Sequence, residues 1–229
     1  VNSPYEEGIT VLSHADDGRS MLSFMLTQYA DGVKEHFVEG DCFTVNNPDE
    51  SFAANASDMV QCNKSLIISC KGHDSQPGTI YYLNDKTFVV ENKLAAPEYP
   101  DFRPVTLAIP GAGSVGCAYP IICENGKVYE FSTSEGALMP ADNFRSTYST
   151  RASVYTDKAP GYFSIFMWDK EVGGLCMLYN AYGPFYCGPD YLLERADCSG
   201  KKNYFDGHIF VTVFAPRVPE RSTEQPTLV

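Results

Sequence analysis

The sequence predicts an all-β fold: an antiparallel sandwich or barrel-like single domain with many short strands and long loops. Apolar and aromatic runs of strand length recur along the chain, and Gly, Pro, Asp and Asn separate them. Aromatic residues are 13% of the 229 residues, and their rings favour strands. A helical period of 3.6 residues fits none of these runs better than a strand does.

The stretch from Gly161 to Phe214 is the centre of this prediction. Three of its runs, Phe163–Trp168, Leu175–Tyr179 and Ile209–Phe214, have the length and composition of strands, with turn residues between them. We expect the earlier part of the chain to pair with this antiparallel centre.

Earlier runs of the same kind predict the remaining strands. Asn125 and Gly126 are the strongest hairpin signal in the chain, and a second tight hairpin is expected at Asn84 and Asp85. The other expected strands are 9–12, 33–38, 42–45, 66–70, 80–83, 87–90, 105–109, 119–123, 127–131 and 152–155, and the segment 21–26 is compatible with a strand or with one helical turn.

The chain divides into a lead-in of residues 1–8, one β domain of residues 9–214 and a polar, Pro-containing tail of residues 215–229. No internal repeat is visible in it. The segments Asn46–Met59 and Ser132–Thr150 are polar and Pro-broken, so we expect both to be exposed loops. Because the first residue is Val1, we expect a processed product or a domain of something larger.

Charge and hydropathy exclude two classes of partner. The net charge is −12, and the Lys and Arg residues are scattered, so the basic face of a nucleic-acid binder is not expected. No apolar run approaches the roughly 18 residues of a membrane span, so membrane insertion is not expected.

The sequence predicts neither a cofactor nor a metal ion. Gly111–Gly116 matches the glycine pattern of dinucleotide sites, but Pro120 would stop the helix that such a site needs. The four histidines, at positions 14, 36, 73 and 208, are not at metal-ligand spacing, and there is no CxxC pair. We assign no catalytic residue and expect a protein that is not an enzyme.

Two alternatives stay open. Eight cysteines and the glycosylation sequons at Asn55 and Asn63 would suit a secreted, disulfide-containing lectin or adhesin module. A third class is a Cys-dependent hydrolase that uses Cys187 and His208.

The acidic, Tyr-rich β pattern with long polar loops resembles the capsid spike of astroviruses. The resemblance implies a homodimeric spike on the virion surface, cut from a capsid precursor. It also implies attachment to a host-cell receptor, which is a protein or a glycan, recognition by neutralising antibodies, and cysteines that are mostly reduced.

Recognition would then use exposed loops. The segment around Tyr182 and Tyr186 is aromatic and rich in turn residues, and rigid tyrosines suit contact surfaces. The loop Ser132–Thr150 adds further candidate binding residues, namely Asn143, Arg145 and Tyr148.

Overall fold

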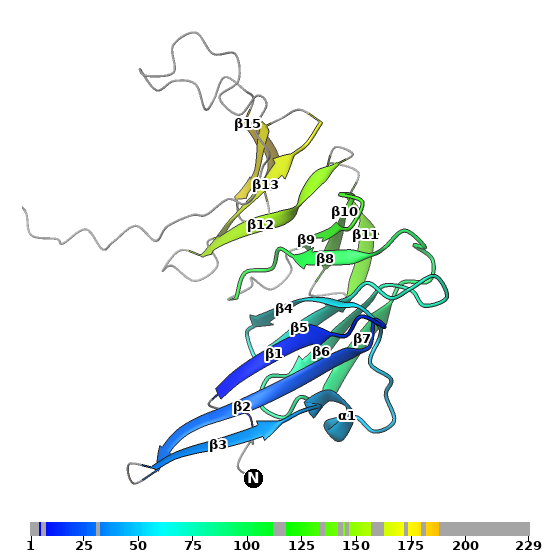
Figure 1. Ribbon diagram of the computed structural model, residues 1–229. Coiled ribbons are helices and arrows are strands. Elements are labelled where there is room, and N and C mark those ends of the chain that lie inside the picture. The colour runs from blue at the N-terminus through cyan, green and yellow to red at the C-terminus, as the bar shows by residue number, and fades with distance from the viewer. Residues whose placement is uncertain are drawn as a thin grey trace, which may run out of the picture.

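Figure 1 shows the computed structural model of the chain. It describes residues 5, 8–30, 33–111, 118–132, 136–141, 144, 147–156, 163–171, 174–179 and 182–187, without the side chains of residues 26–39, 155, 156, 179, 182, 186 and 187. Fifteen strands and one short helix form these parts of the chain, and all strand pairs are antiparallel. The all-β prediction is therefore confirmed.

The described strands form four sheets, and in each sheet neighbours in the chain are also neighbours in space. The first sheet has three strands, and the other three have four strands each. The strands are β1 (Gly8–His14), β2 (Ser20–Ala30) and β3 (Val33–Glu39); β4 (Ala56–Cys62), β5 (Ser65–Cys70), β6 (Thr79–Asn84) and β7 (Val90–Ala95); β8 (Pro104–Leu107), β9 (Ala118–Cys123), β10 (Val128–Ser132) and β11 (Ala137–Pro140); and β12 (Tyr148–Thr156), β13 (Phe163–Asp169), β14 (Gly174–Tyr179) and β15 (Tyr182–Cys187).

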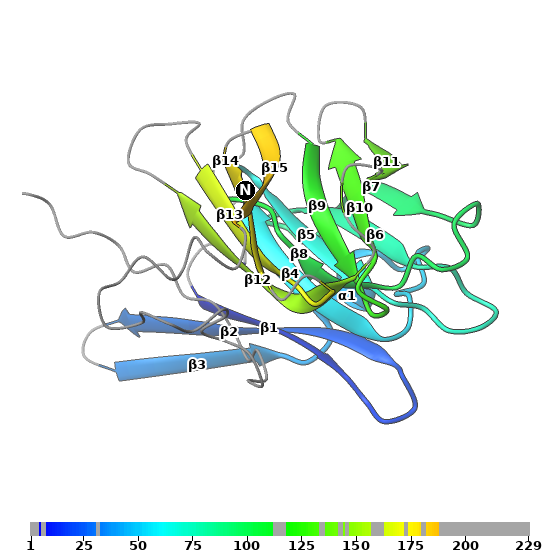
Figure 2. The same ribbon diagram turned by 90° about the horizontal axis from the view of Figure 1, so that it is seen from above.

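The four sheets follow one another in space in the order of the chain, with β1–β3 at one end and β12–β15 at the other (Figure 1). Their first strands adjoin, because β1 contacts β4, β4 contacts β8, and β8 contacts β12 (Figure 2). Consecutive four-stranded meanders of this kind are the units from which β-propellers are built. The described strands close no barrel; instead they repeat one structural unit that the sequence does not reveal.

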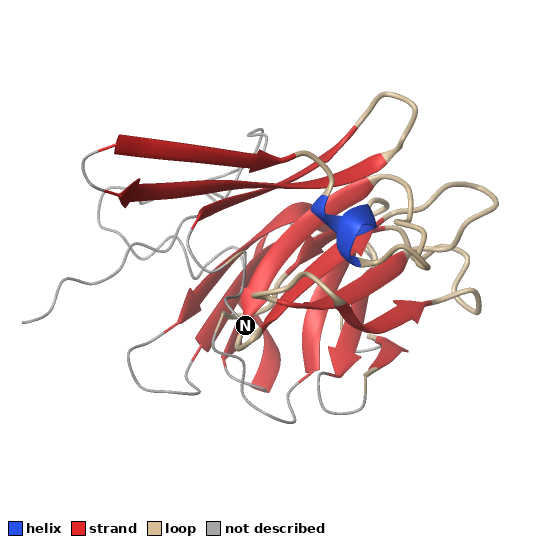
Figure 3. Ribbon diagram, turned by 90° about the horizontal axis from the view of Figure 1, so that it is seen from below, coloured by secondary structure: helices blue, strands red, loops and turns tan. Residues whose placement is uncertain are grey.

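The central strands β5 and β6 of the β4–β7 sheet pack into cores on both faces. Leu66 and Ile68 of β5 pack in a core shared with the first sheet and the helix α1 (Cys42–Asn46), whereas Ile67 packs in a core shared with the two later sheets. Figure 3 shows α1 beside the first sheet, where it contacts β2. Burial on both faces explains why β5 is a continuous apolar run instead of an alternating one.

Aromatic rings bridge each interface between successive sheets. Pairs of this kind favour edge-on or tilted contacts, which add to the free energy gained from buried area. The bridging pairs are Phe24 with Phe88 (6.0 Å between ring centroids), Tyr82 with Phe131 (5.4 Å) and Tyr119 with Phe163 (5.5 Å).

Hydrogen bonds join the first strands of the last three sheets. Ser57 Oγ donates to the Pro104 carbonyl oxygen at 2.6 Å, and the Leu107 amide donates to Asp58 Oδ2 at 2.7 Å. Thr106 Oγ1 donates in turn to the Thr150 carbonyl oxygen. Each of β4, β8 and β12 has an irregular register at these positions, and such bulges re-aim side chains out of their own sheet.

The segment 42–45, expected as a strand, is instead part of helix α1. Asp41 caps this helix, because its carboxylate accepts a hydrogen bond from the Thr44 amide at 3.3 Å. Cys42 and Phe43 are buried, so packing against β2 and the cap outweigh the strand preference of Thr44 and Val45.

Both expected loops contain strands. Within Asn46–Met59, β4 begins at Ala56, and Asn47 and Ala53 are buried. Ser20 of β2 holds this segment, since its hydroxyl donates to the Ala53 carbonyl oxygen at 2.6 Å and accepts from the Ala56 amide at 2.9 Å. The segment Ser132–Thr150 includes β11 and the start of β12, and Pro140 is tolerated there because β11 is an edge strand.

We predict that Asp58→Ala lowers the free energy of unfolding by about 1–3 kcal/mol, because the buried Leu107 amide loses its acceptor. Asp58→Asn keeps an acceptor oxygen and should cost less. Urea denaturation measures both, with Asp16→Ala in an exposed turn as the control. Equal unfolding midpoints for Asp58→Ala and the control would contradict this role of Asp58.

Candidate functional site

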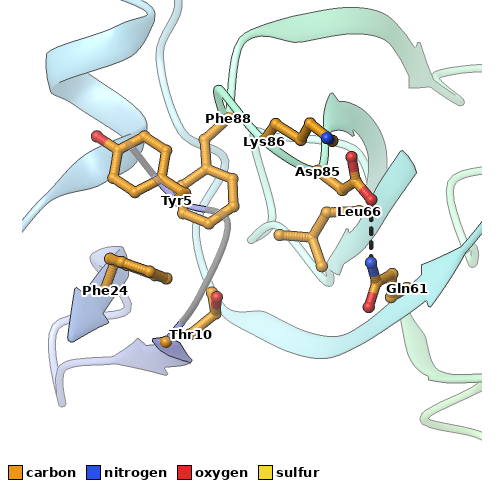
Figure 4. Close-up of a pocket in the computed structure, with 9 residues that line it drawn as sticks. Tyr5, Thr10, Phe24, Gln61, Leu66, Asp85, Lys86 and Phe88 are labelled. Atoms are coloured by element: carbon orange, nitrogen blue, oxygen red, sulfur yellow. Dashed lines mark hydrogen bonds between the residues drawn. The ribbon is translucent and has the colours of Figure 1, made fainter. Parts of the chain in front are cut away.

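A cavity of about 410 Å³ lies where the first sheet meets the β4–β7 sheet. We call it the seam pocket (Figure 4). Its volume falls within the range of small-molecule sites, roughly 300–1,000 Å³. The residues that line it are Tyr5, Gly8, Thr10, Phe24, Gln61, Leu66, Asp85, Lys86 and Phe88.

Stacked aromatic rings form one wall of the seam pocket. Tyr5 lies parallel to Phe88, with ring centroids 4.3 Å apart, and Phe24 meets Tyr5 edge-on at 5.0 Å. All three side chains are buried, so the wall is fixed by the core behind it. Tyr5 belongs to the segment 1–8, which the sequence suggested to be only a lead-in.

Phe88 has an unusual backbone. Its φ is +54°, a left-handed conformation that is rare and strained for a bulky residue. The expected strand 87–90 is therefore wrong for Thr87 to Val89, because β7 begins only at Val90. Strained residues of this kind cluster at functional sites, and Phe88 lines the seam pocket.

Asn47 holds Phe88 in this conformation. Its Nδ2 donates to the Phe88 carbonyl oxygen at 2.9 Å, and its Oδ1 accepts from the Val90 amide at 2.7 Å. Nδ2 also donates to the Phe43 carbonyl oxygen at 2.9 Å, which ties the turn to helix α1. Because Asn47 is buried, water does not compete strongly for these bonds.

The preceding residue, Asn46, holds the other stacked ring. Its Nδ2 donates to Tyr5 Oη at 2.8 Å and to the Cys42 carbonyl oxygen at 2.7 Å. Two consecutive asparagines at the end of α1 therefore position the two rings of the wall. Gly8 completes the fit, because a Cβ there would collide with the Phe24 ring.

The opposite side of the seam pocket is polar. Gln61 Nε2 donates to Asp85 Oδ2 at 3.0 Å, and the Asp85 amide donates to the Lys64 carbonyl oxygen at 3.1 Å, which fixes the turn (Figure 4). Thr10 and Lys86 add a hydroxyl and an ammonium group. One carboxylate and one ammonium among the lining residues leave the pocket without net charge.

Among the residues predicted as binding sites, Asn143 and Arg145 lie outside the described residues, and Tyr148 does not line the seam pocket. Tyr148 is fully buried at the start of β12, where its ring meets Phe144 edge-on at 5.8 Å.

Tyr182 and Tyr186 lie on the edge strand β15, not in a turn, and their side chains are outside the description. The pairing of β15 with β14 imposes this conformation. Phe185 between them is 50% exposed.

Five cysteines with described side chains, Cys42, Cys62, Cys70, Cys123 and Cys176, are buried and form no disulfide. Burial raises the pKa of Cys70 and of Cys123 to about 12, so both thiols are protonated at neutral pH. A protonated thiol is a poor nucleophile. Cys187 and His208, the pair of the hydrolase alternative, have side chains outside the description.

The described residues contain no cluster of His, Cys, Asp or Glu side chains that could hold a metal ion. No helix among them is long and apolar enough to cross a bilayer. The glycine-rich segment after Gly111 lies outside the described residues, and the element that follows it is strand β9. A dinucleotide site requires a helix at that place.

Neither a protein-family model nor a curated protein matches the chain. Among solved structures, one described as the Dos1 propeller is similar over 78% of this chain and 47% of that chain, with 11% sequence identity and a TM-score of 0.39. The chain thus spans about half the length of that structure. The resemblance to astrovirus spikes stays a prediction.

We predict that Asn47→Ala lowers the free energy of unfolding by about 2–3 kcal/mol, because it leaves the Phe88 carbonyl and the Val90 amide without their partner. Asn92→Ala, at an exposed position of β7, is the matched control and should change stability little. Chemical denaturation provides the comparison. If the two variants unfold at the same denaturant concentration, Asn47 does not hold the turn.

Proposed function

We propose that this chain is a non-catalytic recognition module that binds an uncharged saccharide unit in the seam pocket. The observation that carries the proposal is a rim of donors and acceptors without net charge, which faces a rigid aromatic wall. Both features come from segments far apart in the chain, which the fold brings to one place.

The polar rim suits hydroxyl groups. Each sugar hydroxyl both donates and accepts, and the rim offers the acceptor Asp85, the donor Lys86, and Gln61 and Thr10, which do both. The hydrogen bond between Gln61 and Asp85 fixes the orientation of both groups before a ligand arrives. Fixed groups lose less conformational entropy on binding.

Charge favours a neutral ligand. The whole chain carries −12, so it repels anions at long range, and the pocket has no excess of positive charge to offset this repulsion. Phosphorylated and other anionic ligands are disfavoured on this ground. The edges of the Tyr5, Phe24 and Phe88 rings that reach the pocket can contact C–H groups of a sugar ring.

A glycan-binding pocket is compatible with the host attachment predicted from the sequence and with the lectin alternative. Attachment to a host receptor, display on a virion surface and recognition by antibodies remain part of the proposal. Single-copy affinity for one saccharide unit is expected to be weak, so multivalent display would strengthen attachment.

A glycan array followed by calorimetry tests this function. We predict binding of a neutral glycan, and a 10- to 100-fold weaker affinity for Asp85→Ala, because hydrogen bonds to charged groups contribute about 1.5–3 kcal/mol. Glu98→Ala, an exposed carboxylate outside the pocket lining, is the control and should bind like the parent.

Two results would contradict the proposal. One is a bound glycan whose affinity is the same for the parent, Asp85→Ala and Glu98→Ala, which would place the site elsewhere. The other is cleavage of the glycan during the measurement, which would show an enzyme.

A further inference from the structure

The outer face of the last sheet is apolar and rich in aromatic side chains. Alternate residues of β13 belong to the core shared with the β8–β11 sheet, so Phe166 and Trp168 lie on the opposite face. The register places Leu175 beside Trp168, and Met177 between Phe166 and Phe185. We call these five residues the end face.

The end face is only partly covered. Phe185 is 50% exposed, and Phe166, Leu175 and Met177 are half-buried. None of the five side chains belongs to either of the two cores formed by the described residues. None is ionisable, although the chain as a whole carries −12. An apolar sheet face of this kind marks a place where another element packs.

The order of the sheets indicates what covers this face. Each described sheet packs against the sheet formed by the next part of the chain (Figure 1). Strands β4 and β8 each have a register irregularity whose side chains bond to that next sheet. Strand β12 has an irregularity too, between Tyr148 and Ala152, although no described sheet follows it.

The next part of the chain, residues 188–229, lies outside the described residues. It contains the run Ile209–Phe214, which the sequence predicts to be a strand. The preceding segment 188–208 is long enough to cross the roughly 10 Å between packed sheets. We propose that this run packs on the end face as a strand of a fifth sheet. Its docking does not depend on what the seam pocket binds.

Alternation decides which side of the run meets the end face. Ile209, Val211 and Val213 are aliphatic and share one side of a strand, whereas Thr212 interrupts the other side. The aliphatic side therefore packs against the aromatic rings of the end face. Aromatic and β-branched side chains are favourable neighbours in sheets.

Nuclear magnetic resonance of the labelled full chain tests the contact directly. We expect nuclear Overhauser effects between the methyl groups of Val211 or Val213 and the Phe166 ring or the Met177 methyl group. A mixture of labelled and unlabelled chains separates contacts within one chain from contacts between copies. The absence of these effects, or their appearance only between copies, would overturn the proposal.

Fluorescence gives a second test, because Trp168 is the only tryptophan of the chain and is 9% exposed. Val211→Asp should raise the acrylamide quenching constant of Trp168 at least twofold, since a carboxylate is costly to bury and displaces the strand. Val218→Asp, in the polar tail, is the matched control and should be quenched like the parent.

Circular dichroism confirms that both variants are folded, and the Overhauser measurement on the parent depends on neither. Equal quenching of the two folded variants would contradict docking of the run Ile209–Phe214 on the end face.

Discussion

The central strands β5 and β6 are buried on both faces of their sheet, and the arrangement of the other elements depends on this constraint. Successive residues of β5 point into two different cores, so the first sheet must cover one face and the later sheets the other. At roughly 25 cal/mol per Å² of apolar surface, leaving either face uncovered would cost several kcal/mol. The seam pocket lies at the edge of one of these covered faces, where the sheets separate around Gln61 and Asp85.

Hydrogen bonds between the first strands β4, β8 and β12 hold the last three sheets next to one another in chain order. Ser57, Asp58 and Thr106 lie at register irregularities, where a strand departs from its regular pairing. All three residues therefore form a hydrogen bond to the next sheet. Different residue types form these hydrogen bonds in each sheet. The four-stranded sheet therefore recurs in the structure without a repeat in the sequence.

The sequence predicted most strands and the Asn125–Gly126 hairpin, because apolar runs and turn residues are local signals. It did not predict helix α1, whose formation depends on the Asp41 cap and on tertiary packing. The seam pocket could not be predicted either. Tyr5 and Phe88 are 83 positions apart in the numbering (88 minus 5), and neither carries a local motif. The tight hairpin expected at Asn84 and Asp85 is instead a longer turn, because β7 begins only at Val90, and Asp85 bonds to Gln61 and Lys64 of its own sheet.

We propose that the seam pocket, formed before a ligand arrives, is where this chain recognises a neutral saccharide. The most direct measurement is a nuclear magnetic resonance titration of the labelled chain with a glycan that binds. We predict chemical-shift changes at the amides of Thr10, Gln61, Asp85 and Lys86, without changes along β8–β10. Changes confined to residues 132–150 and 182–186 would contradict it and would favour the loop-based recognition first suggested by the sequence.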